Sequence, residues 1–204
     1  MHSYSDSDVV VTNMALPLST FLPPSPDLDD VHLLIAEDML MLNSGVFLLR
    51  VGPWALQFLA DVIAYETYSG GTHVGSADNY KQDQSAIKYV MSMHRNRRAW
   101  LLVPQRWFNA YGGVRDLNNH MAPQAPEAEL PPAEWRIGDL QIHFPGGMKG
   151  NMRPYTEYVE RNWRELSVPL AKTNWEFNIN AYWFVAKDKR RNGIYDKLTT
   201  PLPP

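Results

Sequence analysis

The strongest constraint on the fold is an apolar run that leads directly into a helix start. The four large apolar residues 46–49 follow an Asn-Ser-Gly corner at residues 43–45, and together they predict a short buried strand that the corner opens. Pro53 then favours the first position of a helix. A buried strand followed by an amphipathic helix is half of a βαβ unit, which predicts an α/β protein. The corner is thereby expected at a sheet edge, where such proteins bind ligands. Taken alone, Gly45 is more simply explained by an ordinary tight turn.

The predicted helix after Pro53 carries a broad apolar stripe. Apolar residues recur along it at steps of three and four, the spacing of one helix face. The stripe comprises Trp54, Ala55, Phe58, Leu59, Val62, Ile63 and Tyr65. We therefore expect this whole face to pack against the core, and we expect the helix to end at the Ser-Gly-Gly-Thr sequence of residues 69–72.

Composition limits the class of protein. The chain has 204 residues, 45% of them hydrophobic, with 7 Trp, 10 Tyr and 7 Phe, which is enough to bury one sizeable core, so one domain is the default expectation. A formal net charge of −3 argues against binding nucleic acid or an anionic membrane through a basic surface. The absence of cysteine excludes disulfides and thiolate metal sites. No apolar run approaches the roughly 20 residues that a membrane-spanning helix needs.

An Asp-x-Asp motif precedes the β-branched residues 9–12. Side chains alternate along an extended backbone, so Asp6 and Asp8 point the same way and can present two carboxylates to one divalent cation. For so short a motif taken alone, chance or a solvated strand end is the commoner explanation. Residues 13–41 are rich in Pro and Asp and are expected to form a loop with a solvated acidic cluster and one short helical turn at residues 16–21.

A second helix is predicted to open at residues 82–85. Its buried stripe comprises Ala86, Ile87, Val90 and Met93. Asp83 falls in the first turn, where the helix dipole favours a carboxylate, so capping is the simplest interpretation. The functional alternative is that Asp83 and Gln84 hydrogen-bond sugar hydroxyls at the sheet edge, a role that suits short polar side chains on a rigid element.

Two further strands are predicted. Residues 99–103 form a buried strand ended by Pro104, and the mixed aromatic and polar residues 105–111 suit either a carbohydrate-binding wall or ordinary packing. Residues 137–144 alternate in polarity, which places His143 on the polar face. A glycine-rich turn with Lys149 follows; glycines let backbone N–H groups approach an anion and lysine adds a charge, so metal or phosphate contact is predicted there. A packed histidine is the alternative.

The remainder of the chain carries weaker signals. A third helix is predicted from the stripe Met152, Tyr155, Val159, Trp163 and Leu166, ending before Pro169. Residues 175–186 fit both a strand and a helix pattern, and the basic residues 187–191 are expected to be a solvated end. The proline-rich residues 118–134 predict a surface excursion.

Taken in order, these motifs resemble glycosyltransferase family thirty-four, which includes fungal Golgi galactosyl- and mannosyltransferases and plant xyloglucan xylosyltransferases. A looser form of the pattern resembles glycogenin. The resemblance covers residues 6–149 and is specific because five motifs occur in the same order. They are Asp6-Ser7-Asp8; residues 43–50 with Trp54; residues 83–86; residues 104–106 with 109–111; and residues 143–146 with Lys149.

The resemblance implies an α/β GT-A fold with a mixed sheet flanked by helices, which binds a nucleotide-sugar (a UDP- or GDP-hexose) and a divalent cation, usually Mn²⁺, and transfers the hexose to a glycan acceptor with retention of configuration. It implies the following roles. The metal ligands are Asp6, Asp8 and His143; the catalytic pair beside the transferred sugar is Asp83 and Gln84; the substrate-binding residues are Asn43, Ser44, Gly45, Gly146 and Lys149. Gln82 stands where plant members have an acidic residue, so the sugar contacts are expected to differ.

In a GT-A enzyme the Asp-x-Asp motif ends the nucleotide-binding half, yet only a few residues precede Asp6 here. We therefore expect a C-terminal portion of a family member, with residues 1–168 in the GT-A domain and 169–204 as an extension. The isolated chain is expected to aggregate through the apolar edge at residues 9–11. The resemblance also implies the lumenal side of the Golgi membrane and a complex with related glycosyltransferases. Two alternatives are a hydrolase that uses Asp6 and Asp83, and an inactive remnant that binds a glycan or a partner.

Overall fold

The computed structural model describes residues 1–65, 82–112 and 133–198. The chain forms two compact units, each assembled from separate stretches of sequence, where composition predicted a single domain. The first unit consists of Met1–Tyr4, Pro23–Val103 and Asp188–Pro204, and the second of Ser5–Leu22 and Pro104–Lys187. Neither unit ends at residue 168, and the division predicted there between family domain and extension stays a prediction.

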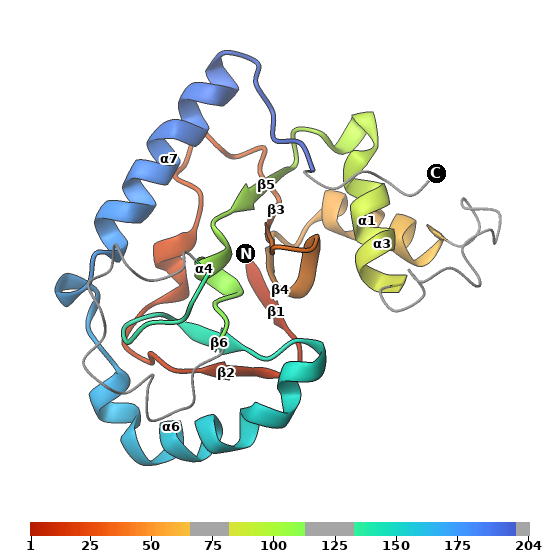
Figure 1. The fold of residues 1–204 in the computed structure, drawn as a ribbon. Helices are drawn as coiled ribbons and strands as arrows, with labels where there is room; N and C mark the ends of the chain where they lie inside the picture. The colour runs from red at the N-terminus through yellow and green to blue at the C-terminus, as the bar shows by residue number, and fades with distance from the viewer. Residues whose placement is uncertain (66–81, 113–132, 199–204) are drawn as a thin grey trace. The chain divides into compact units, whose positions relative to one another are not determined.

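The first unit contains a four-stranded mixed sheet in the order β1-β4-β3-β5. The strands are β1 His2–Ser5, β3 Leu33–Glu37, β4 Leu42–Leu49 and β5 Trp100–Val103 (Figure 1). Strand β3 pairs antiparallel with β4 and parallel with β5. In a βαβ unit, β4 and the next strand, β5, would run parallel. Here β5 is parallel to β3 and therefore antiparallel to β4, so the prediction of a βαβ unit starting at β4 is wrong. The predicted buried strand at residues 99–103 is confirmed as β5.

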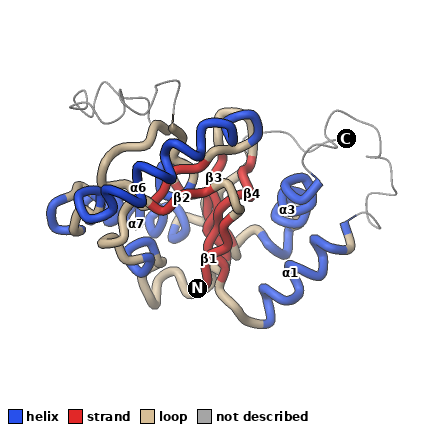
Figure 2. The backbone as a smooth tube through the Cα atoms, turned by 90° about the horizontal axis from the view of Figure 1, so that it is seen from below, coloured by secondary structure: helices blue, strands red, loops and turns tan. Residues whose placement is uncertain are grey.

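Two helices, α1 Pro53–Ile63 and α3 Gln82–Ser92, cover the same side of this sheet (Figure 2). Their core is formed with the strands by Leu33, Ile35, Leu42, Phe47, Phe58, Ile87, Val90, Met91 and Trp100. Both helices confirm the periodicity in the sequence. The stripe on α1 is narrower than predicted, because Leu59 is 39% and Ile63 is 83% exposed. Met93 follows α3 as the cap of a short 3-10 helix, His94–Asn96.

The Asn-Ser-Gly corner lies inside β4 and forms a bulge. Ile35 of β3 pairs with Phe47, while the next residue, Ala36, pairs with Asn43. The three residues 44–46 are therefore looped out of the β3–β4 ladder. The prediction that the corner opens the strand is wrong, since β4 begins at Leu42 and continues through the corner. The corner lies at the end of the sheet beside the last residues of β3, because Asn43 pairs with Ala36, although β4 itself is an interior strand. Hydrophobicity alone could not locate the strand start, because the hairpin that closes the strand is held by polar side chains.

The second unit contains a two-stranded antiparallel sheet of β2 Val9–Val11 and β6 Gln141–His143 (Figure 1). The register pairs Val9 with His143 and Val11 with Gln141. Helix α6 Met152–Leu166 packs on this sheet, as the third predicted stripe requires, although Trp163 is 43% exposed. The core comprises Val10, Ala110, Trp135, Ile142, Phe144, Tyr155, Val159 and Leu166. All residues of β6 are buried, so the predicted polar face of this strand also faces the interior.

Aromatic packing explains residues 105–111. Helix α4 Gln105–Phe108 buries Trp107 and Phe108 against Phe21, which ends the predicted helical turn, a 3-10 helix at Leu18–Phe21. The ring centroids of Phe21 and Trp107 are 5.3 Å apart. These aromatic residues therefore pack in the core, as in the second of the two sequence interpretations. A 3-10 helix, Leu170–Lys172, leads from α6 toward α7.

Helix α7 Trp175–Arg191 settles the ambiguous tail in favour of a helix. Trp175, Ile179, Trp183 and Ala186 form its buried face, at the steps of three and four that a helix requires. The expectation of a solvated basic end is wrong for Arg190, whose side chain is 9% exposed and lies 3.1 Å from Asp30. Its guanidinium also donates to the carbonyl oxygens of Arg98 and Trp100. Asp30 is accordingly paired and not simply solvated.

Residues 69–72 and 118–132, in which the sequence predicted a helix end and a surface excursion, lie outside the described residues. Across the parts of the chain that the structure describes, no helix combines the length and the hydropathy needed to cross a membrane.

Candidate functional site

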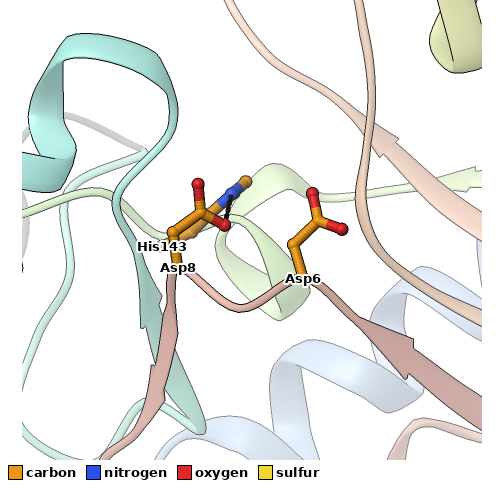
Figure 3. Close-up of side chains that lie close together, drawn as sticks. All are labelled: Asp6, Asp8 and His143. Atoms are coloured by element: carbon orange, nitrogen blue, oxygen red, sulfur yellow. Dashed lines mark ion pairs between the residues drawn. The ribbon is translucent and has the colours of Figure 1, made fainter.

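The β2–β6 pair brings Asp8 next to His143. The backbone N–H of Phe144 donates to the carbonyl oxygen of Asp8 at 2.9 Å, one step beyond the paired residues Val9 and His143. Asp6 lies in the segment between β1 and β2, and all three side chains extend to the same side of it (Figure 3). One ligand-capable atom from each residue lies within 4.8 Å of the others. The structure thus brings together the three residues predicted to bind metal.

His143 is buried, and its protonation pattern follows from its neighbours. Its Nδ1 lies 2.8 Å from Oδ1 of Asn109. An amide oxygen only accepts, so this contact is a hydrogen bond when Nδ1 carries the hydrogen. The lone pair of Nε2 is then directed to the cluster, where Nε2 lies 3.4 Å from Oδ1 of Asp8. This is the tautomer of a histidine that ligates a metal through Nε2 and donates its other N–H to the protein.

The two carboxylate oxygens of Asp8 have different surroundings in the protein. Its Oδ2 lies 3.1 Å from Nζ of Lys149. Its Oδ1 is buried and accepts no hydrogen bond from the described residues. A buried carboxylate oxygen without a donor is unfavourable, and a cation among Asp6, Asp8 and His143 would remove that penalty. Two carboxylates and one imidazole are also a donor set suited to Mn²⁺ or a similar divalent ion.

The glycine-rich turn after β6 has two elements of the predicted diphosphate site. Gly146 has a φ of +58°, a conformation that favours glycine, and this turn starts the 3-10 helix Gly146–Asn151 that contains Lys149. The Lys149 side chain is 61% exposed, so its charge is accessible to an anion as well as to Asp8. Roles for Gly146 and Lys149 in substrate binding stay predictions.

The first unit holds a separate polar site at the β4 bulge. The Ser44 hydroxyl donates to Oδ2 of Asp83 at 2.6 Å, and the Ser44 N–H donates to Oε1 of Gln84 at 3.1 Å. Asp83 lies in the first turn of α3, facing the corner as the sequence predicts. The amide nitrogen of Gln84 lies 3.8 Å from the Met41 sulfur. Sulfur is a weak acceptor, so the Gln84 N–H groups can also donate to a ligand.

Asp38 is a residue of this polar site that sequence reasoning missed. Its Oδ1 accepts the N–H groups of Leu40 and Met41, and its Oδ2 accepts the Asn43 side-chain amide. The Asn43 oxygen in turn accepts the N–H of Gly45 at 2.9 Å. Asp38 therefore closes the β3–β4 hairpin and orients the corner. An aspartate shortly before a turn is the signal that could have revealed it.

Asn109 was also missed as a site residue, although it belongs to one of the motifs above. It follows α4, while His143 ends β6. A buried ion pair between Arg106 and Asp139 joins these two segments at 2.7 Å. Burial raises the pKa of the Asp139 carboxyl above its ordinary value, against the opposing hydrogen bonds from Arg106. This pair fixes the segments that supply Asn109 and His143.

Comparison with known proteins places these features in a family. A family model described as the galactosyl transferase GMA12/MNN10 family, glycosyltransferase family thirty-four, matches residues 22–152. That range includes the Ser44–Asp83–Gln84 site, His143 and Lys149, whereas Asp6 and Asp8 precede it. An uncharacterized alpha-1,2-galactosyltransferase of Schizosaccharomyces pombe is 28% identical over 128 residues, which are 61% of this chain and 28% of that protein. The chain therefore spans about 28% of the length of this curated relative.

No solved structure matches the chain. The mixed sheet flanked by helices is nevertheless of the GT-A-like kind that the resemblance implied. Because the family model covers more than half of the sequence, the chain belongs to the galactosyl transferase GMA12/MNN10 family.

Proposed function

We propose that this chain supplies part of the active site of a metal-dependent, retaining glycosyltransferase that moves a hexose such as galactose from a nucleotide-sugar to a glycan acceptor. Family membership and the name of the S. pombe relative support transfer of galactose. The observation that carries the metal dependence is the buried Oδ1 of Asp8, which has no hydrogen-bond donor among the described residues and faces His143 and Asp6.

The residues of the cluster fit a divalent cation, for which Mn²⁺ is the expected ion. Asp6, Asp8 and His143 would hold it, and when bound it would supply positive charge for the leaving diphosphate. Lys149 adds a second positive charge beside Asp8, at a position accessible to a diphosphate oxygen. Because these groups are fixed before the substrate arrives, they need little rearrangement as negative charge develops.

Asp83 and Gln84 are proposed to contact the transferred sugar. Ser44 holds one oxygen of each side chain, which restricts both side chains to one orientation. The exposed Asp83 carboxylate keeps one oxygen for a sugar hydroxyl, and the Gln84 amide nitrogen makes only a weak contact with the Met41 sulfur, so it can donate to the sugar as well. Asn43 and Gly45 shape the bulge that presents Ser44. Such groups raise turnover when their contacts strengthen in the oxocarbenium-like transition state.

The proposal includes a UDP- or GDP-hexose donor, a location on the lumenal side of the Golgi membrane and assembly with related glycosyltransferases, all of which rest on the family resemblance. Titration of the full-length protein with UDP-galactose, with and without Mn²⁺, tests the core of the proposal. We expect donor binding and galactose transfer to a glycan acceptor only with the ion. Equal donor binding in the presence of a chelator would contradict it.

A further inference from the structure

We propose that Asn109 is a positioning residue that holds His143 in the Nδ1–H tautomer and so directs Nε2 to the cation site. This inference rests on the proposed function in one respect, because it takes Asp6, Asp8 and His143 as the cation site. Asn109 would not touch the ion or the substrate. It would act through the imidazole, as the outer partners of metal-ligating histidines do.

The geometry of the contact is specific. Asn109 is 0% and His143 is 2% exposed, so water does not compete for the 2.8 Å contact between Oδ1 and Nδ1. Oδ1 accepts a hydrogen from Nδ1, which leaves Nε2 with a lone pair. The Nε2 lone pair and the donor-free Oδ1 of Asp8 then face each other at 3.4 Å. Two electron-rich atoms at this distance favour a cation in their neighbourhood.

The opposite orientation of the amide would have the opposite effect. If the Asn109 amide turned over, its NH₂ group would donate to Nδ1, and the imidazole hydrogen would move to Nε2 and point at Asp8. That arrangement would satisfy Asp8 within the protein and close the site to a cation. It would also give a partner to the buried Nδ2 of Asn109, which has no acceptor among the described residues in the observed orientation. The orientation of a single buried amide therefore distinguishes a cation-binding cluster from a self-satisfied one.

The surroundings of Asn109 limit its movement. Its backbone N–H donates to the Gln105 carbonyl oxygen at 2.7 Å, and its own carbonyl oxygen accepts the Gln105 side-chain amide at 3.1 Å. The N–H of His143 donates to the carbonyl oxygen of Ala110 at 2.8 Å, which ties the two segments together beside the contact. The Arg106–Asp139 ion pair joins the same segments a few residues away. These contacts hold the two backbone segments in register, while the orientation of the Asn109 amide depends on its contact with His143, because its Nδ2 has no partner among the described residues.

The test uses the whole chain and two readouts. The first is the His143 tautomer, read from long-range ¹H–¹⁵N spectra of metal-free protein at a pH where the same spectra show the ring to be neutral. The second is the Mn²⁺ dissociation constant, measured by electron paramagnetic resonance. We expect the Nδ1–H tautomer in the unmodified chain, a mixture of tautomers in Asn109→Leu, and Mn²⁺ binding weakened about 10- to 100-fold in that variant. Asn109→Asp keeps an acceptor oxygen and should restore the tautomer.

Asn13→Ala is the matched control. Asn13 is another buried asparagine of the second unit, and its side chain donates to the carbonyl oxygens of Gly138 and Val168 instead of contacting His143. This variant should lose stability without changing the tautomer or, when folded, the Mn²⁺ affinity. An unchanged tautomer in folded Asn109→Leu, or an Nε2–H tautomer in the unmodified chain, would overturn the inference. If the unmodified chain shows the expected tautomer but binds no Mn²⁺, the positioning by Asn109 is supported and the proposed metal dependence fails.

Discussion

The two units contain polar sites that differ in how completely the protein satisfies them. In the first unit, Ser44 donates to both Asp83 and Gln84, and both oxygens of Asp38 accept hydrogen bonds. In the second unit, Oδ1 of Asp8 is buried without a donor among the described residues, next to the Nε2 of His143. The first site is complete as a structural element, whereas the second requires an added positive charge to be complete.

The formal charges of the second site fit a divalent cation. In the second unit, Asp6 and Asp8 contribute −2 and Lys149 contributes +1, while His143 is neutral in the Nδ1–H tautomer. The cluster is therefore negative by one charge, and a divalent ion would make it positive by one, which suits binding of a diphosphate.

The largest expected effect is on the ion pair that supports the second site. Arg106→Ala leaves the fully buried Asp139 carboxylate without its partner, and breaking a buried pair on one side costs about 3–5 kcal/mol of unfolding free energy. Urea unfolding measures this loss. The double variant Arg106→Met with Asp139→Leu should recover much of the lost unfolding free energy. Equal stability of the single and double variants would show that the unpaired Asp139 carboxylate does not cause the loss.

Metal addition should stabilise the chain through the second site. An ion that binds only the folded protein adds about 2.7 kcal/mol when its concentration is about 100 times its dissociation constant. We expect Mn²⁺ to raise the unfolding midpoint and a chelator to reverse the effect. The shift should disappear in His143→Ala and persist in Ser44→Ala, and a shift of the same size in both variants would assign the ion to another site.

Ser44→Ala should weaken the first site by a smaller amount. The substitution removes the 2.6 Å hydrogen bond to the Asp83 carboxylate, and a hydrogen bond to a charged group contributes about 1.5–3 kcal/mol. Asp83 is exposed, so water replaces the lost donor and keeps the effect at the low end of this range. Denaturant unfolding of the metal-free chain checks the value. A loss above about 3 kcal/mol would mean that the bulge is less tolerant than its hydrogen bonds indicate.

The smallest expected effect is a pH dependence in the first unit. Burial, with help from Arg50 and against the effect of Asp30, lowers the pKa of His32 below 6.5, and its ring stacks on Trp54. A lowered pKa in the folded state means that His32 contributes its full stability above about pH 6.5. The contribution is lost as the pH falls through the lowered value, because the buried ring must then take up a proton. His32→Phe should flatten the slope of stability between about pH 7.5 and pH 5, measured by urea unfolding.

The sequence predicted the helices and strands whose apolar residues recur at a regular spacing. The stripes on α1, α3 and α6 and the strand at β5 follow from the spacing of side chains along a helix or strand. Asp6 and Asp8 do lie close together, but they belong to the turn between β1 and β2 and not to the extended strand from which their pairing was predicted. The position of the corner inside β4 did not follow, since the bulge depends on pairing with β3. Asp38, Asn109 and the buried Arg190 were missed because their roles come from partners that are distant in sequence or depend on a turn.

The most direct test of the central claim is Mn²⁺ binding to the whole chain, compared between Asp8→Asn and Asp83→Asn. Both substitutions replace one carboxylate by an amide of the same shape, one in the incomplete site of the second unit and one in the complete site of the first. Electron paramagnetic resonance titration should show one tightly bound ion in the unmodified chain and in Asp83→Asn, and at least about 100-fold weaker binding in Asp8→Asn, more than the loss of an outer partner causes. Equal binding by all three proteins, or a loss confined to Asp83→Asn, would contradict the account.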